Sequence, residues 1–197
     1  MKRRLFLSGP IGCGKSTLIR SALGGLAKSA GGFVTERAFD KNGLLIGFNL
    51  LPACSIACLN RQCTALSFLN FSGGKAQRNN DVFRLDAVRL LTEAMTKPFA
   101  IIDEFGGYEL LVPEFSQALM AFLESNIPCV GVLKAPAASE ALRTSVSLPS
   151  EYLDIAAKLR AALKSDPDAE ILETSGRGDR NAQATLRAWM EEYANVE

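Results

Sequence analysis

The stretch 5–17, LFLSGPIGCGKST, constrains this chain more than any other part of the sequence. It has a glycine at position 9, four further residues, and then Gly-Lys-Ser at 14–16, which is the P-loop pattern. Small residues let successive backbone N–H groups turn inward around phosphate oxygens, and the helix that follows adds its positive dipole end. An apolar run precedes the motif and a helix-forming run follows it, so the strand–loop–helix context is the one that the pattern requires.

The motif predicts roles for individual residues. Lys15 would contact the β- and γ-phosphates and act in catalysis, and the Ser16 hydroxyl would coordinate Mg²⁺. A glycine-rich turn that carries a lysine by chance is the alternative, and the strand–loop–helix context argues against it. The predicted nucleotide contacts from this stretch are Gly9, Pro10, Ile11, Gly12, Cys13, Gly14, Lys15, Ser16 and Thr17.

A second motif, FAIIDE, lies at 99–104. Four apolar residues that end in Asp-Glu predict a buried parallel strand with acids at its carboxyl end, the Walker B pattern. Asp103 would hold Mg²⁺ through water or Ser16, and Glu104 would polarise the attacking water as a catalytic base. Because neighbours on a strand start toward opposite faces, the two acids cannot duplicate each other. A strand ending in acids is common, so this assignment depends on the P-loop in the same chain.

Composition narrows the class of protein. The 197 residues fit one domain, expected to span 1–197, and 48% are hydrophobic, as in an ordinary globular α/β protein. A net charge of +1 argues against a dedicated nucleic-acid or membrane surface. The most apolar stretch, 43–59, is interrupted by Asn49 and Pro52 and is short for a membrane span, and no signal peptide is apparent, so a cytoplasmic location is expected. A monomer is favoured.

Two further compositional features bear on the chemistry. The chain has no histidine, which excludes a histidine triad and an imidazole base. Cys54, Cys58 and Cys63 lie close together, but structural zinc needs four ligands, so reduced packing cysteines are expected instead.

The order of elements predicts an α/β fold: a doubly wound, mainly parallel sheet with a β-hairpin after the first helix. Ligands bind at the carboxyl ends of such strands. Strands are expected at 5–7, 32–37, 44–50, 99–104, 127–133 and 169–174, with another extended piece within 53–69. Helices are expected at 15–28, 85–96, 113–125, 150–164 and 180–193, the last capped by Asp179. Residues 72–81 and 135–149 are expected to be loops.

Several of these motifs together resemble the small nucleoside-triphosphatases first recognised in thermophiles, a family that also includes a vertebrate cancer-related enzyme. The resemblance rests on SGPIGCGKSTL at 8–18, GFVTER at 32–37, DEFGGYEL at 103–110 and the loop at 174–179. The sequence departs from the family at Ser16, usually Thr, at Tyr108, usually Met, and at 177–179, where Arg-Gly-Asp replaces Asn-Arg-Asp. The resemblance implies slow, Mg²⁺-dependent hydrolysis of several NTPs to NDP and phosphate, with weak base selectivity.

The sequence does not identify which residue neutralises the charge that develops on the transferred phosphoryl group. Arg37, Lys134 and Arg177 each end an expected strand or lie in a loop at the catalytic edge. Arg37 and Arg177 are predicted to contact the nucleotide, and a solvated surface position is the alternative for each.

Three other protein classes share parts of this pattern. A nucleotide or small-molecule kinase has the same core, but it needs an arginine-rich lid, and 135–149 offers only Arg143. A nucleotide-dependent switch remains possible, although no Asn-Lys-x-Asp guanine motif is present. An ABC-transporter ATPase is rejected because FSGGKAQR at 71–78 comes too early to be its signature and no switch histidine exists.

Overall fold

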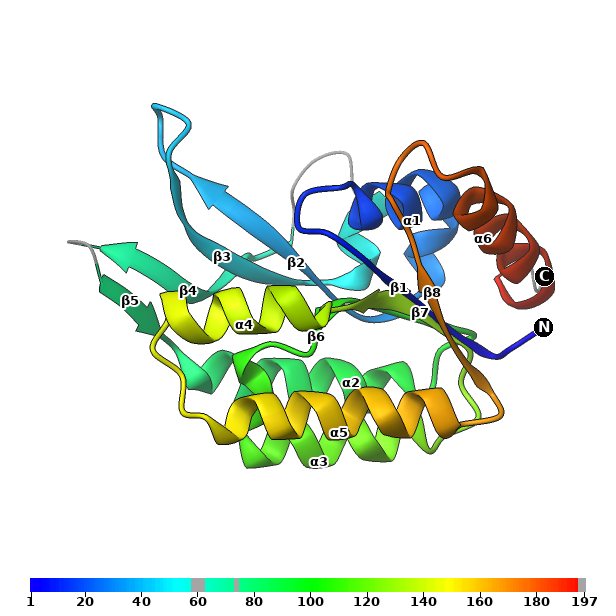
Figure 1. The fold of residues 1–197 in the computed structure, drawn as a ribbon. Coiled ribbons are helices and arrows are strands. Elements are labelled where there is room, and N and C mark those ends of the chain that lie inside the picture. Colours follow the sequence, from blue (N-terminus) through cyan, green and yellow to red (C-terminus); the bar gives the residue numbers. More distant parts are fainter. Residues whose placement is uncertain (58–62, 73–74, 195–197) are drawn as a thin grey trace.

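The computed structural model, which describes residues 1–57, 63–72 and 75–194, is built around one eight-stranded sheet (Figure 1). The strand order is β5-β4-β3-β2-β6-β7-β1-β8, and the pairs among β2, β6, β7, β1 and β8 are parallel. This confirms the predicted α/β class with a mainly parallel sheet. The strands are β1 Arg4–Ser8, β2 Gly31–Phe39, β3 Leu45–Pro52, β4 Leu66–Ser72, β5 Lys75–Arg78, β6 Ala100–Phe105, β7 Cys129–Leu133 and β8 Ala169–Glu173.

Helices cover both faces of the parallel strands. Leu5 and Leu7 of β1 face one core with α1 (Lys15–Leu23) and α6 (Arg180–Tyr193), whereas Phe6 faces the other. The second core contains α2 (Val88–Ala94), α3 (Pro113–Leu123) and α5 (Glu151–Ser165). Because β1 is buried on both sides, its middle residues 5–7 are apolar. The loop that follows β1 lies at the carboxyl edge of the parallel strands.

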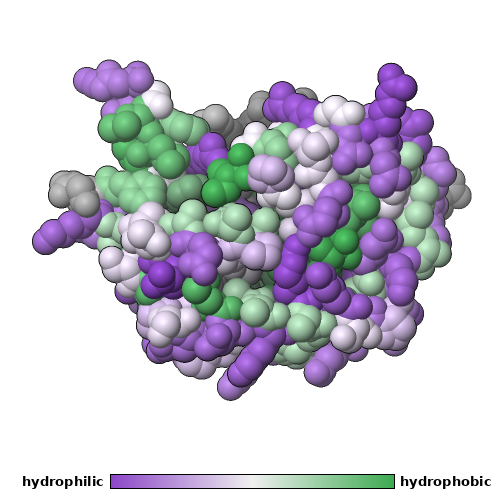
Figure 2. All heavy atoms as spheres, in the orientation of Figure 1, coloured by the Kyte–Doolittle hydropathy of each residue, from purple (hydrophilic) through white to green (hydrophobic). Residues whose placement is uncertain are grey.

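The predicted β-hairpin after the first helix is present. β2 pairs in parallel with β6 and then in antiparallel with β3, and β4 and β5 extend this arm beyond the parallel strands (Figure 1). At its turn, Asp40 Oδ1 accepts hydrogen bonds of 2.8 Å from the N–H groups of Asn42 and Leu44. Figure 2 shows hydrophobic side chains gathered over this hairpin, where Phe39, Leu44 and Ile46 are exposed.

Several expectations about individual elements were wrong. The helix expected at 15–28 ends at Leu23, because Gly24 adopts φ 48° and a 3₁₀ turn, Gly24–Ser29, replaces the rest. The loop expected at 72–81 contains β5, a polar edge strand that pairs with β4 and needs no apolar face. The helix expected from 85 begins earlier, with a π-helical turn at Val82–Ala87. The extended piece expected within 53–69 is present as the first part of β4, which begins at Leu66 and continues beyond this range; a 3₁₀ turn covers Ala53–Ala57, and residues 58–62, including Cys58, lie outside the described part.

The loop expected at 135–149 instead contains helix α4, Pro136–Ser145. Proline at its first position suits a helix start, and the alanine, glutamate and leucine that follow are strong helix formers. The small residues were interpreted as loop-forming, but alanine has the highest helix propensity. α4 packs against α5 and borders the cleft described below.

Candidate nucleotide-binding site

The loop between β1 and α1 has the conformation of a phosphate-binding loop. Gly12 and Gly14 have φ of 76° and 101°, a backbone region that favours glycine and turns N–H groups toward one point. No side chain among the described residues caps α1, so the amides of its first turn are available to an anion. The loop can therefore hold phosphate oxygens with backbone groups alone.

Lys15 is held inside this loop. Its Nζ donates hydrogen bonds to the carbonyl oxygens of Gly9 at 2.9 Å and Pro10 at 2.7 Å, and only 8% of the residue is exposed. Gly9 and Pro10 thus contact the lysine and do not line the cleft with the rest of the loop. Bound phosphate would offer the ammonium group a charged acceptor, which makes a stronger hydrogen bond than a carbonyl oxygen.

Ser16 and Asp103 form a pair beneath the loop. The Ser16 hydroxyl donates to Asp103 Oδ1 at 2.8 Å, and Asp103 is fully buried at the end of β6. Its Oδ2 is buried and has no hydrogen-bond partner among the described residues. Burial raises the pKa of Asp103 to about 7, and the hydrogen bond from Ser16 opposes that rise. A buried carboxylate oxygen without a partner is costly unless a cation or a proton satisfies it.

These two residues fit a magnesium ion. Hydroxyl and carboxylate oxygens are the hard donors that Mg²⁺ prefers, and the ion usually takes one or two protein groups, with water and phosphate oxygens completing its shell. Within 1–57, 63–72 and 75–194, no cluster of three or more His, Cys, Asp or Glu side chains could hold a metal by itself. The predicted metal ligands are therefore side by side, in an arrangement that needs a phosphate to complete it.

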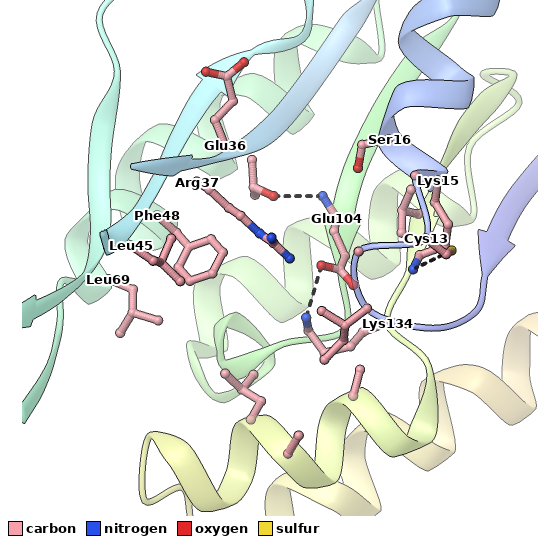
Figure 3. Close-up of a pocket in the computed structure, with 18 of the residues that line it drawn as sticks. Cys13, Lys15, Ser16, Glu36, Arg37, Leu45, Phe48, Leu69, Glu104 and Lys134 are labelled. Atoms are coloured by element: carbon pink, nitrogen blue, oxygen red, sulfur yellow. Dashed lines mark hydrogen bonds and ion pairs between the residues drawn. The ribbon is translucent and has the colours of Figure 1, made fainter. Parts of the chain in front are cut away.

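Glu104, the next residue of β6, faces the cleft (Figure 3). Its Oε2 is 3.2 Å from Nζ of Lys134, which follows β7, and its backbone N–H donates to Thr35 Oγ1 at 3.3 Å. The two neighbouring acids thus have different surroundings: Asp103 is buried with Ser16, whereas Glu104 is partly exposed beside a lysine. These different surroundings allow the two acids to take different roles.

The two predicted arginines occupy different places. The Arg37 side chain extends from β2 into the cleft toward Glu104, and its guanidinium makes no hydrogen bond or ion pair with any residue the structure describes (Figure 3). Arg177 lies against the P-loop: its Nη2 donates to Thr17 Oγ1 at 3.1 Å, and its N–H donates to Cys13 O at 3.2 Å. Asp179 caps α6 as predicted, accepting from the N–H of Ala182 at 3.0 Å.

All these groups meet around one cleft of about 940 Å³. The predicted residues that line it are Ile11, Gly12, Cys13, Gly14, Lys15, Ser16, Thr17, Arg37, Glu104 and Arg177. Asp103 lies beneath its floor. Sequence reasoning did not assign Thr35, although Thr35 and Arg37 share a face of β2 by strand alternation, and this could have identified it.

Two other acids near the cleft, Glu109 and Glu36, have partners of their own. Glu109 is buried and accepts hydrogen bonds of 2.7 Å from the N–H groups of both Gly106 and Gly107, so it holds the loop after β6. Burial raises the pKa of this carboxyl. Glu36 lines the cleft and pairs with Arg20 at 2.7 Å. Glu104 is thus the acid placed beside both the P-loop and the open cleft.

Comparisons with known proteins agree with this geometry. A protein family described as NTPase matches residues 4–166. Among solved structures, THEP1 from the hyperthermophile Aquifex aeolicus is similar in fold, with a TM-score of 0.61 over 96% of this chain and 98% of that chain, at 18% sequence identity. No curated protein matches this chain. Among the described residues, no helix has the length and apolarity needed to cross a membrane.

Proposed function

Because this chain belongs to the NTPase family and is therefore a nucleoside-triphosphate hydrolase, we propose that it hydrolyses several NTPs to NDP and phosphate in the P-loop cleft, with Mg²⁺. The observation that carries the proposal is the Ser16–Asp103 pair beneath the P-loop, with a buried Asp103 oxygen that has no partner in the described part of the chain.

Each residue has a distinct task in this proposal. The P-loop amides and Lys15 bind the β- and γ-phosphates, and Ser16 and Asp103 hold the Mg²⁺ ion, which neutralises phosphate charge when bound. Glu104 orients a water molecule and accepts its proton as the water oxygen attacks the γ-phosphorus. The bond from that phosphorus to the bridging oxygen breaks, and NDP leaves. Lys134 keeps the Glu104 carboxylate at the cleft until the γ-phosphate is in place.

The position of Arg177 supports weak selectivity among nucleobases. The loop at 174–179 places one guanidinium beside Thr17, and a guanidinium can stack on any base. The sequence contains no Asn-Lys-x-Asp guanine motif. We therefore expect ATP, GTP, CTP and UTP all to be substrates.

Phosphate release measured with each of these four NTPs tests the proposal. Release should occur slowly from all four, and EDTA should abolish it, because Asp103 and Ser16 cannot neutralise phosphate charge without a cation. Release from GTP alone would favour a nucleotide-dependent switch. A strict requirement for an added nucleoside, with no release in its absence, would favour a kinase.

Lys15→Ala is expected to weaken nucleotide binding. Loss of a hydrogen bond to a charged group costs about 1.5–3 kcal/mol, which corresponds to an affinity about 10- to 150-fold lower. Isothermal titration with Mg·ADP measures it, and Lys28→Ala, which removes an exposed lysine from the turn after α1, is the matched control and should bind as wild type. Wild-type affinity and turnover in Lys15→Ala would contradict the P-loop assignment.

A further inference from the structure

The cleft has two chemically different halves. The half formed by the P-loop, Glu104 and Lys134 carries the charged and phosphate-binding groups described above. The other half, here called the apolar half, is formed by the antiparallel arm on one side and by α4 with the residue after it on the other. Its hydrophobic lining includes Leu45, Phe48, Leu69, Phe71, Leu142 and Val146.

Contacts between aromatic rings hold the side chains of the apolar half in place. Phe48 stacks on Phe68 with ring centroids 6.2 Å apart and makes an edge contact with Phe71 at 6.1 Å, so its ring is fixed from the arm side. Phe48 and Leu69 are directly paired across β3 and β4, which places them on one face of the sheet. Figure 3 shows Leu45, Phe48 and Leu69 together beside Arg37. A charged triphosphate gains no favourable contact from such an apolar surface, and transferring that surface from water to an apolar ligand is favourable.

The position of this half relative to the nucleotide follows from α1. Ser16 faces Asp103, on the side where Mg²⁺ and the γ-phosphate belong. Thr17, one residue later, points about 100° away around the helix and contacts Arg177 instead. The nucleoside end of the substrate is therefore expected on the Arg177 side. Seen from the P-loop, Leu45, Phe48 and Leu69 lie beyond Arg37 and Glu104 (Figure 3), so the apolar half is expected past the γ-phosphate.

We propose that the apolar half binds a second small molecule, one with an apolar ring body and a hydroxyl group, so that its hydroxyl meets Glu104 where the attacking water would otherwise lie. The charged groups at the border, Arg37, Glu104 and Lys134, match the polar end of such a molecule, and Phe48, Leu69 and Leu142 match its ring. The cleft volume of about 940 Å³ is near the upper end of the range for small-molecule sites, roughly 300–1,000 Å³. This inference rests on the proposed function, because it uses the same base and the same phosphates.

The chemistry at this site would be phosphoryl transfer. The hydroxyl oxygen attacks the γ-phosphorus, the bond from that phosphorus to the bridging oxygen breaks, NDP leaves with the electron pair, and the hydroxyl proton passes to Glu104. Hydrolysis is then the reaction that occurs when water takes the place of the acceptor.

Binding of 2-naphthol, a fluorescent ring compound with one hydroxyl, tests the site without turnover. We expect it to bind the protein saturated with Mg·ADP, and both ligands to be bound together. Phe48→Ala and Leu142→Ala, from opposite walls, should each weaken 2-naphthol binding by about tenfold while leaving Mg·ADP affinity unchanged. Ile46→Ala is the matched control, because Ile46 is on the same strand as Phe48 but is exposed outside the cleft. With ATP as substrate, phosphate release should fall as 2-naphthol saturates.

Three results would overturn the inference: no binding of 2-naphthol to the Mg·ADP complex, displacement of 2-naphthol by Mg·ADP, or wild-type 2-naphthol affinity in both wall variants. Displacement would mean that the apolar half takes the nucleobase. These results are independent of the hydrolysis assay, so failure of the proposed function, seen as no phosphate release from any NTP, is distinguishable from failure of this inference.

Discussion

Glu104→Gln is expected to lower NTP turnover by about 10²–10⁴-fold while Mg·nucleotide binding is retained, because glutamine keeps the shape of the side chain and removes the proton acceptor. Glu104 is the acid that faces the open cleft at the end of β6, with its carboxylate 3.2 Å from Lys134 Nζ. Asp103 cannot substitute for it, since that carboxyl is buried against Ser16. Single-turnover hydrolysis separates the chemical step from product release and measures the effect directly.

Glu36→Gln is the matched control for this experiment. Glu36 also lines the cleft, but its carboxylate pairs with Arg20, so its replacement should change turnover little. A wild-type single-turnover rate in Glu104→Gln would show that Glu104 only caps the strand or meets solvent. The base would then have to be Glu36 or Glu109, and the second of these is already occupied by two backbone N–H groups.

The parallel part of the fold could be predicted because its signals are local. β1 and β6 are buried on both faces, so they appear as short apolar runs, and each ends in a motif that carries the site. Asp179 and the 180–193 helix were predicted with the correct bounds because a capping side chain and a helix start are determined by adjacent residues. The P-loop residues and the Ser16–Asp103 pair follow from the same local patterns.

Other parts of the fold were missed. α4 carries local signals, a proline at its start and alanines that favour a helix, but its small residues were interpreted as a loop. β5 is a polar edge strand, and its pairing with β4 is a tertiary contact that its own residues do not indicate. Tyr108 shows the same limit: its hydroxyl donates to Phe68 O at 2.6 Å and ties the loop after β6 to β4. Nothing near residue 108 in the sequence indicates that contact. The pairing of Glu104 with Lys134 likewise joins the ends of two strands that are neighbours only in the folded sheet.

Arg37→Ala is expected to lower kcat by about 10³-fold, the lower end of the contribution made by an arginine that stabilises charge on a transferred phosphoryl group. Arg37 suits this role because its side chain extends into the cleft toward Glu104 and its guanidinium makes no ion pair or hydrogen bond within the described residues, so no such contact has to be broken when it meets the γ-phosphate. The loss should appear mainly in kcat, since the charge that Arg37 meets develops in the transition state.

Arg177→Ala provides the contrast that makes this prediction specific. Arg177 contacts Thr17 and Cys13 on the P-loop, away from Glu104, so its loss should raise KM and leave kcat nearly unchanged. Arg37→Lys should recover only part of the activity, because lysine keeps the charge but lacks the planar fork that binds two phosphate oxygens. Steady-state kinetics with ATP and Mg²⁺ measure all three variants. If Arg37→Ala keeps wild-type kcat while Arg177→Ala loses it, the charge on the γ-phosphate is stabilised from the loop at 174–179, and the hairpin arm takes no part in the chemical step.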